Sequence, residues 1–88
     1  DNFATLSKKM SELGAELLVE SLSVIENPDF KPRSQDDSIA TFAPKIDKSF
    51  GKIDWSESAH LINSKIKALS FSPGTFTSIN GKRLKIYP

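Results

Sequence analysis

Few side chains in this sequence could carry out acid–base chemistry. His60 is the only histidine, and Glu57 precedes it by three residues, a spacing at which two side chains can meet on a helix. A histidine that acts as a general base needs a positioned carboxylate of this kind. However, His60 lies one position beyond the apolar stripe of a predicted helix, in its first turn. We therefore interpret His60 as a histidine on the surface of a helix.

The sequence also lacks the patterns that bind metals or phosphates or activate a nucleophile. The chain has no cysteine, and Asp36-Asp37 is followed neither by a glycine-containing calcium loop nor by a second cluster of carboxylates. Its four glycines are isolated, and no serine lies in a nucleophile-elbow pattern. We predict no catalytic, cofactor-binding or metal-binding residue here, and we place Asp36-Asp37 in a solvated linker.

The basic side chains concentrate in one half of the sequence, although the formal net charge is only +1. Residues 1–44 carry four basic and eight acidic side chains, a balance of −4. Residues 45–88 carry eight basic and three acidic side chains, a balance of +5. A basic half of this kind often faces nucleic acid, because lysines and arginines that neutralise phosphates release counterions.

Two groups of these basic residues are regularly spaced, one at intervals of three and four residues and one at alternate positions near aromatic residues. Basic side chains interleaved with aromatic ones suit contact with RNA phosphates and stacking on bases. The alternative is an ordinary hairpin surface whose aromatic residues are covered by the next element. The predicted nucleic-acid contacts are Lys45, Lys48 and Lys52 in the first group and Arg83 and Lys85 in the second.

The first element that the sequence predicts is an amphipathic helix from Ala4 to about Glu26. Asn2 can cap its free amides, and Asn27-Pro28 ends it, because proline disfavours helical geometry in the residue before it. The apolar stripe of this helix needs a partner surface, and the nearby sequence holds too few apolar residues to provide one. The stripe consists of Leu6, Met10, Leu13, Leu17, Leu18, Leu22 and Ile25.

The middle of the chain predicts a connector and then a second helix. Residues 27–52 contain three prolines and a polar run, so we expect a long linker that joins two domains. Ser56 is the expected N-cap of the second helix, which should end near Ser70.

A β-hairpin is predicted at the end of the chain. Asn80-Gly81 is the preferred two-residue turn, because both of its positions must accept a positive φ, and it lies between Thr75–Ile79 and Lys82–Tyr87. Pairing across this turn puts alternate residues on opposite faces, of which we expect the first to be core. The first face holds Thr75, Thr77, Ile79, Leu84 and Ile86, and the second holds Phe76, Arg83, Lys85 and Tyr87.

The length of 88 residues allows one small domain, yet these elements do not form a closed core. An isolated hairpin is marginal in water, so we expect a piece of a larger protein. No apolar run approaches the roughly 20 residues of a membrane span, and no basic region precedes an apolar stretch as it does in a signal peptide, so we expect no targeting to a membrane. The lack of cysteine favours a cytosolic location.

Six segments match a known family in their order along the chain. They are Leu13–Leu18, Gln35-Asp36, Thr41–Ile46, Ile53–Ser56, Pro73–Thr77 and Asn80–Ile86. Together they resemble the methionyl-tRNA formyltransferases of the folate-dependent formyltransferase family. Phe42 stands where this family often has tyrosine, and Ser70-Phe71-Ser72 stands where it often has Asn-Pro-Trp.

The resemblance implies an α+β fragment of two domains. Residues 1–26 would be the last helix of a Rossmann-like formyltransferase domain, and residues 27–52 the interdomain linker. Residues 53–88 would start a C-terminal OB-like tRNA-binding domain, in which the second helix and the hairpin begin the barrel.

The resemblance also implies a reaction for the parent enzyme. A formyl group would pass from 10-formyltetrahydrofolate to the methionine amino group of initiator Met-tRNA, in the cytoplasm or an organellar matrix. The family's catalytic residues and folate pocket would precede Asp1, so the 88 residues alone should be inactive. They would supply the linker and part of the tRNA-binding region.

Three alternatives stay open. A sugar-amine formyltransferase or a formyltetrahydrofolate hydrolase shares the segment Ile53–Trp55, although the run from Pro73 to Ile86 favours the tRNA enzyme. A winged-helix nucleic-acid module should pack two helices just before its hairpin, where this chain has a proline-rich linker. A non-catalytic interaction fragment is the third alternative.

Overall fold

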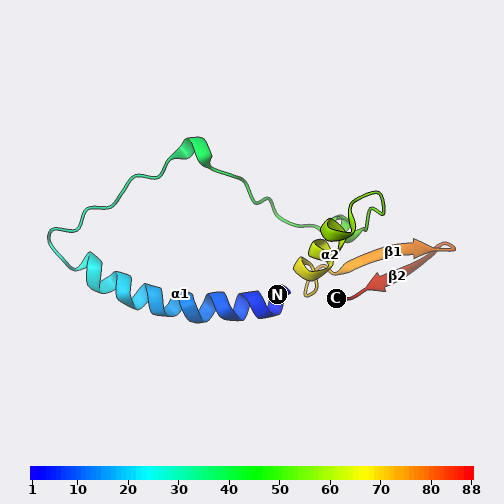
Figure 1. The fold of residues 1–88 in the computed structure, drawn as a ribbon, viewed down its shortest axis with the longest axis horizontal. Helices are drawn as coiled ribbons and strands as arrows, with labels where there is room; N and C mark the ends of the chain where they lie inside the picture. Colours follow the sequence, from blue (N-terminus) through cyan, green and yellow to red (C-terminus); the bar gives the residue numbers. More distant parts are fainter.

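The computed structural model describes all 88 residues, which form two α-helices, two short 3₁₀ turns and one β-hairpin. In Figure 1, α1 lies apart from the hairpin, and the segment after it arcs away before it returns to α2. The predicted α+β composition is confirmed. The elements are α1 (Phe3–Ile25), η1 (Asp37–Ile39), η2 (Lys48–Gly51), α2 (Ala59–Ala68), β1 (Thr75–Ile79) and β2 (Lys82–Ile86).

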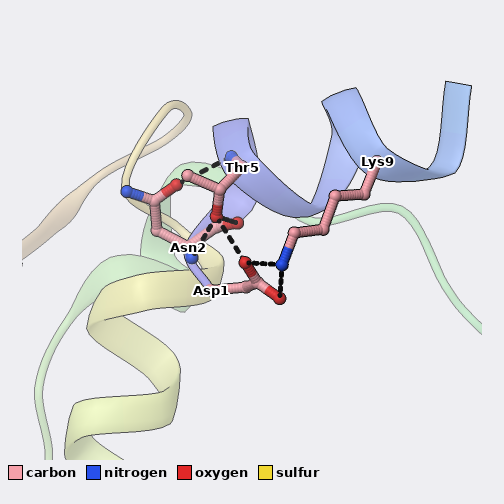
Figure 2. A network of polar contacts seen from close by, with 4 residues as sticks. All are labelled: Asp1, Asn2, Thr5 and Lys9. Atoms are coloured by element: carbon pink, nitrogen blue, oxygen red, sulfur yellow. Dashed lines mark hydrogen bonds and ion pairs between the residues drawn. The ribbon is translucent and has the colours of Figure 1, made fainter. Parts of the chain in front are cut away.

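Helix α1 begins with a capping box, as Figure 2 shows. The Asn2 side chain accepts a hydrogen bond from the Thr5 amide, and the Thr5 hydroxyl accepts one from the Asn2 amide, each at 3.0 Å. The Asp1 carboxylate accepts from the Thr5 hydroxyl and from the Lys9 ammonium. The predicted cap at Asn2 is confirmed, and it contributes about 1 kcal/mol to the helix.

The apolar stripe of α1 is exposed along its length, as its sequence predicts, and only Leu6 and Met10 at its start share a cavity with residues of α2. No residue of α1 is buried, and the stripe residues are between 48% exposed at Leu6 and 66% exposed at Leu13. At the start of the helix, the Phe3 ring stacks on Phe71 in the turn after α2, with ring centres 5.5 Å apart.

Helix α2 begins two residues later than its sequence predicts. Its N-cap is Ser58, whose hydroxyl accepts a hydrogen bond from the Leu61 amide, so the prediction of Ser56 was wrong. Ser56 instead donates its amide and its hydroxyl to the Asp54 carboxylate. This local turn competes with the helix for the same serine. The helix ends at Ala68, two residues before the predicted limit of Ser70.

Three turns of the chain share this hydrogen-bond pattern. In each, one aspartate oxygen accepts hydrogen bonds from the hydroxyl and the amide of the serine two residues later. These bonds favour the charged carboxylate and lower the pKa of each aspartate, and the hydroxyl bond is the larger cause. The pairs are Asp36–Ser38, Asp47–Ser49 and Asp54–Ser56.

The lowered pKa predicts how the turn at Asp54 responds to acid. The turn contributes stability above the ordinary carboxyl pKa of about 3.9 and loses it as the pH falls through the lowered pKa of the folded chain. We expect the Asp54 carboxyl to titrate below about 3.9 in a carbon-13 NMR titration, and Ser56→Ala to return its pKa toward that value. Identical titration curves in the two proteins would contradict the assigned cause.

The hairpin has the predicted register. Thr75 pairs with Ile86, Thr77 with Leu84 and Ile79 with Lys82, so the two predicted faces are confirmed. Asn80 and Gly81 have φ values of 50° and 74°, as this turn requires.

The prediction that one whole face of the hairpin is core was wrong at its outer end. Thr75 is only 2% exposed, whereas Ile79 is 53% exposed and Leu84 is 45% exposed. In Figure 1, α2 lies near the start of β1 while the turn of the hairpin projects away from it. The small core therefore gathers at the near end and consists of the buried residues Gly51, Ile53, Leu69 and Thr75.

Candidate nucleic-acid interface

Two of the predicted contacts flank an aromatic residue in the sheet. Lys52 pairs with Phe76 in a parallel bridge, and Phe76 pairs with Lys85 in the antiparallel hairpin. The Ile53 amide donates to the Phe76 carbonyl at 2.9 Å and anchors this bridge. Residues paired across neighbouring strands present their side chains to one face. Lys52 and Lys85 therefore lie on the same face as Phe76, one on each side of it.

Arg83 belongs to the same face, two residues from Lys85 along β2. Its guanidinium carbon lies 3.6 Å from the centre of the Phe76 ring. A cation held over an aromatic ring at an exposed site contributes about 0.5–1 kcal/mol. We call the four residues Lys52, Phe76, Arg83 and Lys85 the basic–aromatic face.

The other two predicted contacts lie outside this face. Lys48 begins η2, Lys45 precedes it in an irregular segment, and both side chains are exposed. Their spacing of three and four residues would align them with Lys52 on an α-helix, but η2 is a single 3₁₀ turn of four residues. The structure thus brings together Lys52, Arg83 and Lys85 and does not add Lys45 and Lys48 to them.

Lys65 positions this face and was missed in the sequence. Its ammonium donates a hydrogen bond to the Lys52 carbonyl at 3.0 Å and lies 5.9 Å from the centre of the Phe50 ring. This hydrogen bond therefore links α2 to Lys52, the residue that pairs with the hairpin. The sequence offered one signal for this role. Lys65 lies three residues after Ile62, next to the apolar stripe of α2, where the stem of a lysine can pack on apolar residues while its ammonium reaches a polar partner.

A cavity of about 180 Å³ opens beside the basic–aromatic face. The turn after α2, the start of β1 and the end of β2 form its walls. Arg83 and Lys85 line it, and none of its lining residues is acidic. Three aromatic rings also line it, those of Phe71, Phe76 and Tyr87.

The remaining candidates do not form a second site. His60 is exposed in the first turn of α2, which confirms its interpretation as a surface histidine, and it has no ion pair with Glu57. No three side chains of the types that bind metals are close enough to share an ion. Neither helix is long and apolar enough to span a membrane.

Comparison with known proteins covers the whole chain. The methionyl-tRNA formyltransferase of Caldicellulosiruptor saccharolyticus is 51% identical over 87 residues, which are 99% of this chain and 27% of that protein. The methionyl-tRNA formyltransferases of Dictyoglomus turgidum and Syntrophus aciditrophicus are 46% and 39% identical, each over 99% of this chain and 28% of their own length. The chain therefore spans little more than a quarter of the length of these curated relatives.

The family comparison matches the part of the chain that contains the interface. The sequence model for the C-terminal domain of formyl transferases matches residues 45–88, which include all five predicted basic contacts. The resemblance found in the six ordered segments is thereby confirmed. With half of its length matched, the chain belongs to the formyl transferase family through the C-terminal domain of that family.

Proposed function

We propose that this chain is part of an enzyme that transfers a formyl group from 10-formyltetrahydrofolate to the methionine amino group of initiator Met-tRNA. The observation that carries the proposal is the identity of 39–51% to three methionyl-tRNA formyltransferases along 99% of the chain. In this proposal, the formyl donor and the reacting amine bind outside the 88 residues.

We assign the residues of the chain to two domains and a linker. Residues 1–26 would be the last helix of a Rossmann-like domain, and the exposed stripe of α1 supports this assignment because it needs a surface to cover it. Residues 27–52, largely irregular, would be the interdomain linker. Residues 53–88 would begin an OB-like barrel. The outer edge of β2 is unpaired, and further strands could join it and cover the exposed Ile79 and Leu84.

The role of these residues would be to hold the tRNA. Lysine and arginine side chains that contact phosphates give affinity that weakens with salt and carries little sequence information. The basic–aromatic face supports such a role, since it gathers three cations around one ring with no acidic side chain in the adjoining cavity. Lys45 and Lys48 would extend this contact along the linker.

The reaction is tested with the full-length protein. We expect it to transfer the formyl group of 10-formyltetrahydrofolate to initiator Met-tRNA, and we expect the 88-residue chain alone to show no transfer. Two further assays, with a nucleotide-linked amino sugar as acceptor and with water alone, separate this proposal from the sugar-amine formyltransferases and the hydrolases. Turnover in either of these assays without formylation of Met-tRNA would overturn the proposal.

A further inference from the structure

We propose that the cavity beside the basic–aromatic face holds one unpaired nucleotide of the bound RNA. This inference rests on the proposed function and names the element of RNA that the interface takes. The base would lie against Arg83 and the aromatic rings, and its phosphate would lie against Lys85.

The lining of the cavity matches the two parts of a nucleotide. Three aromatic rings line the cavity, although Phe3 stacks on one face of Phe71 and Arg83 lies over one face of Phe76. Two cations offer a charge opposite to that of a phosphate. Proteins that bind unpaired nucleotides combine these two features, because every base has a π-face and every nucleotide carries a phosphate. Because no lining residue is acidic, no carboxylate offsets the positive charge of Arg83 and Lys85 in the cavity.

Arg83 is held in an arrangement that suits stacking. Its guanidinium carbon lies 3.6 Å from the centre of the Phe76 ring, and the side chain is exposed. A planar guanidinium that rests on a ring has a second side, and RNA bases stack on guanidinium planes as they do on aromatic rings. The contact with Phe76 restrains the Arg83 side chain before RNA binds, so less side-chain freedom is lost on binding.

The size of the cavity suits an unpaired nucleotide and not a paired one. Its volume of about 180 Å³ is below the roughly 300–1,000 Å³ of pockets for drug-sized ligands, and it fits a single small planar group. A base within an A-form helix is stacked on both sides and cannot enter without leaving its pair. The cavity therefore favours a loop, bulge or end of an RNA over a continuous duplex.

The test compares two RNAs with the full-length protein. One is a 12-base-pair duplex, and the other is the same duplex with one unpaired 2-aminopurine nucleotide. Stacking of a base on a protein side chain is worth about 1–3 kcal/mol, so we expect about 5- to 150-fold tighter binding of the bulged RNA.

The matched variant is Arg83→Lys, which keeps the charge and removes the planar group. We expect this variant to lose the preference for the bulged RNA over the plain duplex, because the flat surface on which the base stacks is gone. An unsubstituted protein that forms formyl-Met-tRNA but binds both RNAs equally would overturn the cavity proposal alone. A variant that keeps the full preference for the bulged RNA would also overturn it. Failure to formylate Met-tRNA would instead count against the proposed function.

Discussion

Substituting alanine for Gly51 is expected to disrupt the folded unit formed by η2, α2 and the hairpin. An added Cβ at residue 51 would lie 2.1 Å from the carbonyl oxygen of Gly74, a backbone atom that cannot move away as a side-chain end can. Gly51 is buried, so one of two backbone segments must shift. Overpacking of this kind typically costs about 1–3 kcal/mol, and we place Gly51→Ala at the upper end. The whole core holds only four buried residues, of which Gly51 is one, so little stability is available to absorb the loss.

Amide hydrogen exchange in the 88-residue chain measures this effect. Two amides report on the unit, that of Ile53, bonded to Phe76, and that of Gly74, bonded to the Leu69 carbonyl. We expect both to lose their protection in Gly51→Ala. Retained protection at both amides would show that the two segments can separate without cost.

Gly14→Ala provides the matched control. An added Cβ at Gly14 meets no atom within 4 Å, and the residue lies inside α1. Alanine is about 0.8–1.0 kcal/mol more favourable than glycine within a helix. We therefore expect this variant to gain helical circular dichroism while the Ile53 and Gly74 amides keep their protection. The same substitution thus has opposite effects at two glycines, and the surroundings of each glycine decide the sign.

The difference between these glycines shows which features the sequence could predict. The register of the hairpin depends on the adjacent residues Asn80 and Gly81, so a short-range rule was sufficient. The cap of α1 also depends on neighbours, Asn2 and Thr5. The approach of Gly51 to Gly74 joins residues 23 positions apart, and no local pattern in the sequence encodes it.

The misplaced start of α2 has a different cause. Ser56 and Ser58 are both acceptable caps, and the choice depends on Asp54, whose carboxylate binds Ser56. A rule that ranks capping residues one at a time does not include this competition. The extent of the core was mispredicted for a related reason. Alternation predicts which residues share a face of the hairpin, but it does not predict how far along that face α2 covers them.

The candidate interface was only half predictable. Arg83 and Lys85 lie in a hairpin whose register follows from its turn, so their shared face could be predicted. The addition of Lys52 depends on the parallel bridge to Phe76 and on the hydrogen bond from Lys65, which are contacts between distant segments. Regular spacing grouped Lys52 with Lys45 and Lys48, because spacing alone does not distinguish a helix from an irregular segment.

Removing the three cations of the basic–aromatic face is expected to weaken tRNA binding and flatten its salt dependence. Each phosphate contact contributes about 0.7–0.9 to the slope of the logarithm of the binding constant against the logarithm of the salt concentration. If Lys52 and Lys85 each contact one phosphate while Arg83 stacks on a base, the triple substitution to alanine makes the slope shallower by about 1.4–1.8. Between 50 and 200 mM salt, the unsubstituted protein should then lose about 7- to 12-fold more affinity than the variant. The substituted residues are Lys52, Arg83 and Lys85.

Two further variants of the full-length protein make this result specific. Alanine at Lys8, Lys31 and Arg33 removes three exposed cations from the acidic half of the chain, and we expect the slope and the KM for tRNA to stay unchanged. Alanine at Lys45 and Lys48 removes the linker cations, and a slope lowered by about 1–2 would add them to the contact.

These variants separate a local contact from a general effect of charge. Any loss of three positive charges weakens the long-range attraction of a protein for RNA, but only charges that touch phosphates release counterions and change the slope. The three residues surround one ring within a hydrogen-bonded sheet, so they would meet the RNA as a unit. An equal change of slope in the face variant and in the variant of the acidic half would therefore contradict the interface, even if both variants bound tRNA more weakly.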